Sequence, residues 1–228
     1  NANKDAAVVG SLVFGSKSGI KDDLDIIDSD DKTMWVVDLC QFRVDPKLIH
    51  ELLEKRAIIM LTGSKFFQAP PFCAAMLVPR KWGEELKKVD ASIIEPYGKL
   101  FSAYDVPWFM QNMRKYLPLK ENKALRLRWE IALDEMEAYS YWSVAQTDDI
   151  ITRWATAVMA RIEDSTYFRL MPDQHKTNMS IISFQVWVGG TALDNSQLKA
   201  LFKAITTSIH EGFKDGIKKV FFGQPVQY

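Results

Sequence analysis

A buried strand, a capped helix and a second buried strand follow one another between residues 33 and 63, and this order constrains the fold most strongly. The strands are predicted at "TMWVVD" (33–38) and "AIIMLTG" (57–63), because short apolar runs rich in β-branched residues are typical of strands covered on both faces. The helix is predicted by Asp45 at the N-cap and Pro46 at the first helical position. Strands joined through a helix pair in parallel by a right-handed crossover. We therefore expect an α/β fold, a mostly parallel sheet with flanking helices.

Neighbouring segments extend this pattern. Residues 6–20 predict an earlier strand leading into a glycine-bearing loop, and residues 72–79 predict a later strand. Between them, "DLDIIDSDDK" (23–32) predicts a short amphipathic helix or turn. Residues 80–120 carry scattered proline, glycine and aromatic residues with no clean period, so we expect a linking region with short helices there.

The second half of the chain predicts a smaller α+β domain. Its expected elements are a helix at 121–142, a helix opened by Asp148 or Asp149, a strand at 179–189, an N-capped helix at 194–213 and a strand at 218–228.

Composition excludes several classes of partner. Lys and Arg total 29 and Asp and Glu total 29, so the chain has no broad basic field to attract nucleic acid or an anionic membrane. No apolar run is long enough to span a membrane, and "NANKDAA" lacks the order of a signal peptide. Two cysteines without a Cys or His at ligand spacing suit a reducing compartment and predict no metal site. These features predict a soluble cytoplasmic protein.

Polar residues end both central strands, where ligands bind in open α/β sheets. Asp38 and then Gln41 follow the first strand, and Thr62, Ser64 and Lys65 follow the second. A lysine amine can form a Schiff base with a carbonyl, and a carboxylate can hold a pyridinium nitrogen protonated. The two hydroxyl groups can donate to a phosphate, and the Gln41 amide can bond a ring oxygen. Together these groups fit pyridoxal 5'-phosphate.

The aromatic and proline residues that follow Lys65 add a further expectation. "FFQAPP" (66–71) predicts a stiff apolar turn, which would exclude water from Lys65 and lead into the next strand.

The segments "VVDLCQ" and "IIMLTGSKF" resemble the aspartate and lysine segments of fold-type I pyridoxal-phosphate-dependent transferases, closest to the class V aminotransferase and cysteine desulfurase group. The resemblance implies that Asp38 pairs with the pyridine nitrogen and that Gln41 contacts the ring hydroxyl oxygen. It implies that Thr62 and Ser64 touch the phosphate, and that Lys65 is the catalytic residue, forming the internal aldimine.

The resemblance also implies an organisation and an activity. Residues 1–100 correspond to part of the large, cofactor-binding domain, and residues 101–228 to a helical linker and a small C-terminal α+β domain, so the chain matches the C-terminal portion of such a transferase. The implied protein is an aminotransferase-like enzyme acting on an amino acid or small amine, as a homodimer or in association with an N-terminal portion. The alternative is a non-catalytic fragment or degenerate module of the same fold with a structural or interaction role.

Overall fold

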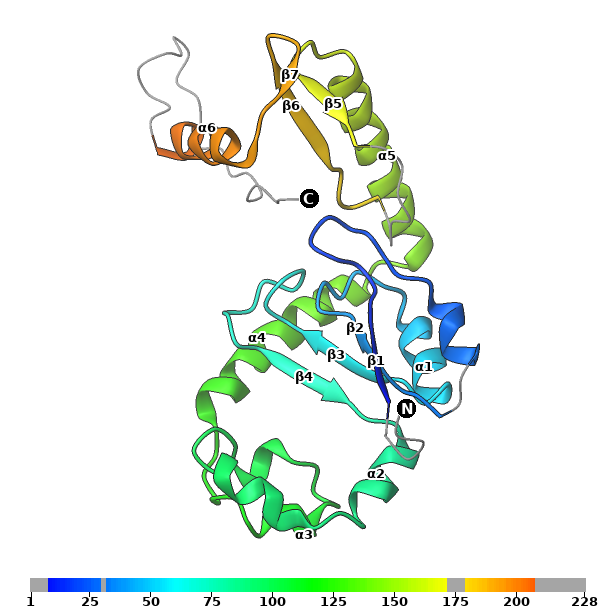
Figure 1. The fold of residues 1–228 in the computed structure, drawn as a ribbon, viewed down its shortest axis with the longest axis vertical. Coiled ribbons are helices and arrows are strands. Elements are labelled where there is room, and N and C mark those ends of the chain that lie inside the picture. Colours follow the sequence, from blue (N-terminus) through cyan, green and yellow to red (C-terminus); the bar gives the residue numbers. More distant parts are fainter. Residues whose placement is uncertain (1–7, 30–31, 172–178, 208–228) are drawn as a thin grey trace, which may run out of the picture. The chain divides into compact units, whose positions relative to one another are not determined.

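The computed structural model describes residues 8–29, 32–171 and 179–207, which divide into two compact units (Figure 1). The first unit runs through Thr147, and the second begins at Asp148. The resemblance implies a helical linker and a small C-terminal domain from residue 101 onward, whereas residues 101–147 belong to the first unit.

The first unit is built on a four-stranded sheet in the order β1-β2-β3-β4 (Figure 1). β1 (Val9–Val13) pairs in parallel with β2 (Met34–Asp38), and β2 pairs in parallel with β3 (Ile58–Thr62). β4 (Ala74–Leu77) pairs antiparallel with β3, because the segment between them is too short for the crossover that a parallel partner requires. The predicted α/β fold is confirmed, with a mixed sheet and flanking helices.

The helix between β2 and β3 forms as its sequence predicts. α1 spans Pro46–Glu54, and the Asp45 side chain accepts a hydrogen bond from the backbone N–H of Lys47 at 2.9 Å. Proline at the helix start loses no intrahelical hydrogen bond, since the first N–H groups of a helix have no partner. Leu48, Ile49 and Leu52 of α1 pack against the sheet.

Only one face of the sheet is fully covered by the described residues. On that face, residues of β1, β2 and β3 join α1 in the main core cluster, whose buried members are Leu12, Ile27, Val37, Leu39, Leu52, Ala57, Ile59 and Leu61. On the other face Val9 is 61% exposed and Met76 is 58% exposed. Both of these exposed residues belong to the edge strands β1 and β4. The expectation that both faces are covered is confirmed for the central strand β3, which has buried residues on both faces, and β2 has no exposed residue.

Short helices connect the sheet to a long helix, as the irregular sequence of this region predicts. They are α2 (Arg80–Leu86), η2 (Ala91–Tyr97), η3 (Ala103–Asp105) and α3 (Gln111–Arg114), and η1 (Leu24–Ser29) lies earlier, between β1 and β2. The long helix is α4 (Lys123–Ser140), whose Ala132 is buried against the segment after β3.

The described part of the second unit contains two helices, the first of which begins four residues before the unit does, and three short strands. α5 spans Val144–Glu163, and α6 spans Asn195–Thr207. β5 (Phe168–Leu170), β6 (Phe184–Val188) and β7 (Thr191–Ala192) form an antiparallel sheet. The strand predicted at 218–228 and the end of the helix predicted at 194–213 lie outside the described residues.

The predicted start of α5 at Asp148 or Asp149 is wrong. Ser143 caps the helix, because its hydroxyl accepts the N–H of Gln146 at 3.2 Å and the Gln146 side chain accepts the N–H of Ser143 at 2.9 Å. This reciprocal pair is a capping box, which starts the helix at Val144. Across the described ranges, no helix has both the length and the apolar character that crossing a membrane needs.

Candidate functional site

The carboxyl ends of β2 and β3 lie next to each other at one edge of the sheet. Asp38 is the last residue of β2 and lies in register with Met60 of β3, two positions before Thr62. Since parallel neighbours end at the same edge, the segment Asp38–Gln41 and the turn Thr62–Lys65 share that edge.

Cys40 lies in the sequence between Asp38 and Gln41, two of the predicted site residues. The Asp38 carboxylate accepts the backbone N–H of Cys40 at 2.7 Å. The pKa of the Cys40 thiol is raised to about 11, first by burial and then by the hydrogen bond to Asp38 and the charge of Asp38, whereas the Lys65 charge lowers it. The charges of Asp38 and Lys65 therefore act on this thiol in opposite directions.

The hydroxyl groups of Thr62 and Ser64 bond to each other within the turn. The Thr62 hydroxyl donates to the Cys73 carbonyl oxygen. The bond of 2.8 Å between the two hydroxyl groups is therefore donated by Ser64, and the Ser64 backbone N–H also donates to Thr62 Oγ1 at 3.1 Å. Both hydroxyl hydrogen atoms are thus used inside the turn. Thr62 is buried and Ser64 is half-buried, so only Ser64 can turn toward a ligand without opening the core.

Lys65 is exposed, and the expectation that the following aromatic residues exclude water from it is wrong. The rings instead pack together beneath the turn: Phe67 meets Phe42 edge to face at 5.2 Å and Phe66 meets Tyr139 of α4 at 5.3 Å between ring centroids. Phe67 is 8% exposed in this cluster. Lys65 is therefore accessible to solvent, and the aromatic residues that follow it pack into the protein instead of covering it.

Gln41 and Arg43 complete this edge. Gln41 is buried, in keeping with a residue held in place beside Asp38. The Arg43 guanidinium lies 4.9 Å from the centre of the Phe66 ring, and burial lowers the pKa of Arg43 while Tyr139 raises it. The sequence analysis did not include Arg43 among the site residues, although Arg43 lies only two residues after the predicted site residue Gln41.

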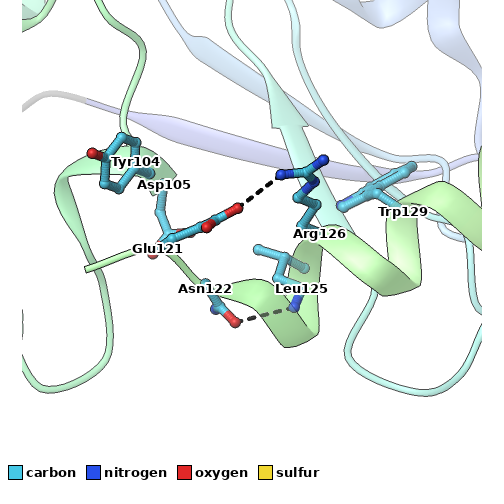
Figure 2. Close-up of a pocket in the computed structure, with 7 residues that line it drawn as sticks. All are labelled: Tyr104, Asp105, Glu121, Asn122, Leu125, Arg126 and Trp129. Atoms are coloured by element: carbon cyan, nitrogen blue, oxygen red, sulfur yellow. Dashed lines mark hydrogen bonds and ion pairs between the residues drawn. The ribbon is translucent and has the colours of Figure 1, made fainter. Parts of the chain in front are cut away.

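A separate cavity of about 400 Å³ lies where α4 begins, and its lining comes from the segment around η3 and from the first turns of α4 (Figure 2). Its lining residues are Tyr104, Asp105, Glu121, Asn122, Leu125, Arg126 and Trp129. The sequence analysis missed this pocket, because two of its lining residues, Tyr104 and Asp105, come from a region with no regular period.

Ion pairs and caps fix the polar side chains of this cavity. Arg126 pairs with Glu121 at 3.1 Å and with Glu130 at 2.8 Å, and these two hydrogen bonds raise the pKa of Arg126. The Asp105 carboxylate accepts the N–H of Ser102 at 2.7 Å, and the Asn122 side chain accepts the N–H of Leu125 at 3.0 Å. The cavity is therefore lined by side chains that are already oriented.

Comparison with protein-family models gives no match, and comparison with curated protein sequences gives none either. The class that the structure itself defines is an α/β protein with a mixed sheet and polar residues at the carboxyl ends of two neighbouring parallel strands.

Proposed function

We propose that this chain is the cofactor-bearing part of a pyridoxal-phosphate-dependent, aminotransferase-like protein that acts on an amino acid or a small amine. The observation that supports the proposal best is that Asp38 ends one strand and the turn with Lys65 follows its parallel neighbour, so that both lie at one edge of the sheet. An amine and a carboxylate placed together in this way are the two groups that the cofactor requires from its protein.

The donor set at this edge fits pyridoxal 5'-phosphate in most respects. Lys65 offers an exposed primary amine, and the half-buried Asp38 offers a carboxylate that the backbone of Cys40 holds in one orientation. Gln41 offers an amide for the ring oxygen. For the phosphate, Ser64 is the hydroxyl that can rotate outward, while Thr62 holds the turn through Cys73.

When bound, the cofactor supplies an aldehyde that condenses with amines and a ring that accepts electrons from the substrate. The residues of this chain do the remaining work. Lys65 would hold the cofactor through its amine, and the same amine, when free, would move a proton at the substrate α-carbon. Asp38 would hold a proton on the ring nitrogen, and Gln41 would orient the ring through a hydrogen bond to its oxygen.

Reductive trapping tests this proposal. The protein is incubated with pyridoxal 5'-phosphate below one equivalent, reduced with borohydride, digested and analysed by mass spectrometry. We expect the pyridoxyl group on the peptide that contains Lys65, and its loss in Lys65→Met. Lys47→Met is the matched control, since Lys47 is another exposed lysine, at the start of α1. Equal labelling of all exposed lysines would contradict the proposal.

A specific observation also favours the second candidate, a non-catalytic module that associates through its surface. Val9 and Met76, on the edge strands, are exposed on the face of the sheet that lies opposite the main core cluster. Large exposed apolar side chains on one sheet face suit association with a second copy of the chain. Light scattering after size exclusion tests this: we expect a dimer, and a monomer when Val9 and Met76 are both changed to Lys. If Lys65 is labelled selectively and the chain is a monomer, the second candidate is excluded.

A further inference from the structure

We propose that the cavity at the start of α4 binds a small organic cation with an alkylated ammonium head group. The cavity lies within the first unit, and the proposal is independent of any cofactor at Lys65. Its volume of about 400 Å³ falls in the range of sites for small molecules.

The charges of the lining favour a cation. Asp105 and Glu121 contribute two carboxylates, and Arg126 contributes the one positive charge of the lining. Arg126 is in addition paired with Glu130, which does not line the cavity. The positive charge is therefore shared between two carboxylates, and the lining keeps a net negative charge.

Two aromatic side chains add walls that attract cations. In Figure 2, Tyr104 and Trp129 lie at opposite ends of the labelled group, with the Glu121–Arg126 pair between them. The Tyr104 ring already takes part in one cation–π contact, with Arg114 at 5.7 Å, and the Arg114 side chain is held by the Val106 carbonyl outside the lining. Aromatic faces beside carboxylates are the combination that recognises quaternary ammonium ligands.

The existing hydrogen bonds determine which kind of ammonium fits. An Asp105 oxygen accepts the Ser102 N–H, and Glu121 accepts from Arg126, so part of the accepting capacity of both carboxylates is already used. Their charge remains available, and a head group that donates no hydrogen bond needs only that charge. An alkylated ammonium group therefore suits this lining better than a primary ammonium group, which needs three acceptors.

Matched probes test the charge requirement directly. Choline and its neutral isostere 3,3-dimethylbutan-1-ol have the same shape and differ in one charge. Each is titrated into the whole chain while the indole N–H signals are followed by NMR, and the Trp129 signal is assigned by its loss in Trp129→Phe. We expect choline to shift the Trp129 signal in a saturable manner, and the isostere to bind at least about fivefold more weakly. Equal binding, no saturable shift, or tighter binding of ethanolamine than of choline would overturn the proposal.

Charge variants give predictions of opposite sign. Glu121→Gln removes a negative charge from the lining and should weaken choline binding about threefold at low salt, whereas Arg126→Gln should strengthen it by a similar factor. Tyr104→Leu should weaken it roughly two- to fivefold. Glu137→Gln is the control, since this exposed glutamate lies further along α4 and outside the lining, and should change binding by less than about twofold. Weaker choline binding in Arg126→Gln would show that the charge of the lining does not control binding, and would overturn the proposal.

Discussion

Gly63 lies so close to Ala132 that a Cβ atom on Gly63 would stand only 2.4 Å from the Cβ of Ala132. A side chain at position 63 would also approach the Cys73 sulfur at 3.1 Å. The absence of a side chain at Gly63 therefore lets α4 pack directly onto the turn that carries Ser64 and Lys65. The position of the candidate lysine is set by this contact as well as by the sheet.

Replacing Gly63 with alanine should destabilise the protein. We expect Gly63→Ala to lower the free energy of unfolding by about 1–3 kcal/mol, because a methyl group has no space and α4 must shift. Gly83→Ala is the control, since its nearest neighbour is Phe109 at the ordinary contact distance of 3.6 Å and alanine favours the helix there by up to about 1 kcal/mol. Urea denaturation measures both, and equal stabilities of the two variants would contradict the contact.

Phe67 should be a main source of stability for the turn. Phe67→Ala removes a ring that is 8% exposed and that contacts Phe42, Phe66 and Tyr139, so we expect a loss of about 3–5 kcal/mol. Phe72→Ala is the matched control, because that ring is 87% exposed and should cost less than about 0.5 kcal/mol. Thermal and urea unfolding test the difference. A similar small loss in both variants would place Phe67 outside the core.

Cys40 should react slowly with alkylating reagents in the folded protein. Its pKa of about 11 lies two units above the ordinary value of 9.0, so at pH 8 the reactive thiolate is roughly a hundredfold less abundant than for a free cysteine. Because protonation is favoured in the folded state, the associated stability is complete below pH 9.0 and is lost as the pH rises through about 11. Iodoacetamide labelling across pH 7–11, read by peptide mapping, measures the pKa.

Two substitutions at the candidate site should move the Cys40 pKa in opposite directions. Asp38→Asn removes the charge that raises it and should speed alkylation at a given pH, whereas Lys65→Met removes the charge that lowers it and should slow alkylation. Lys47→Met should leave the rate unchanged. Unaltered rates in both site variants would mean that neither Asp38 nor Lys65 acts on the Cys40 thiol, and would contradict the proposed arrangement of the site.

The Asp45 cap should contribute about 1 kcal/mol to stability. Asp45→Ala removes the acceptor of the Lys47 N–H, whereas Asp45→Asn keeps an acceptor of the same geometry and should retain most of the stability. Urea denaturation of the two variants separates the cap from a general effect of charge, since both remove the carboxylate. Equal losses in the two would indicate that only the charge matters.

Local sequence signals predicted the central part of the fold well. Asp45 and Pro46 located the start of α1, and the apolar runs located β2 and β3, because each signal depends on the nearest residues alone. The parallel pairing followed from the helix between the strands. The shared edge of Asp38 and Lys65 was therefore predictable before any contact was known.

Features that depend on distant residues were not predictable in this way. Lys65 is exposed because Phe66 and Phe67 pack against Tyr139 and Phe42 instead of covering the lysine. These two partners lie far from them in the sequence. The cavity at the start of α4 joins Tyr104 to Trp129 across an irregular segment. The start of α5 was a different kind of failure, since the capping box of Ser143 and Gln146 was present in the sequence but two aspartates offered a competing cap.

The Cys73 carbonyl oxygen accepts both the backbone N–H of Gly63, at 2.9 Å, and the Thr62 hydroxyl, and the Gly63 carbonyl in turn accepts the N–H of Ala69 at 3.0 Å. The segment that carries Lys65 is thus a loop tied at its base to the first pairs of the β3–β4 ladder. Opening this loop requires breaking the end of the hairpin, so the amide hydrogens of Gly63 and Ala69 should exchange with solvent together with those of the ladder. The Lys65 side chain is therefore exposed to solvent, while the loop that carries it opens only when the end of the β3–β4 ladder opens.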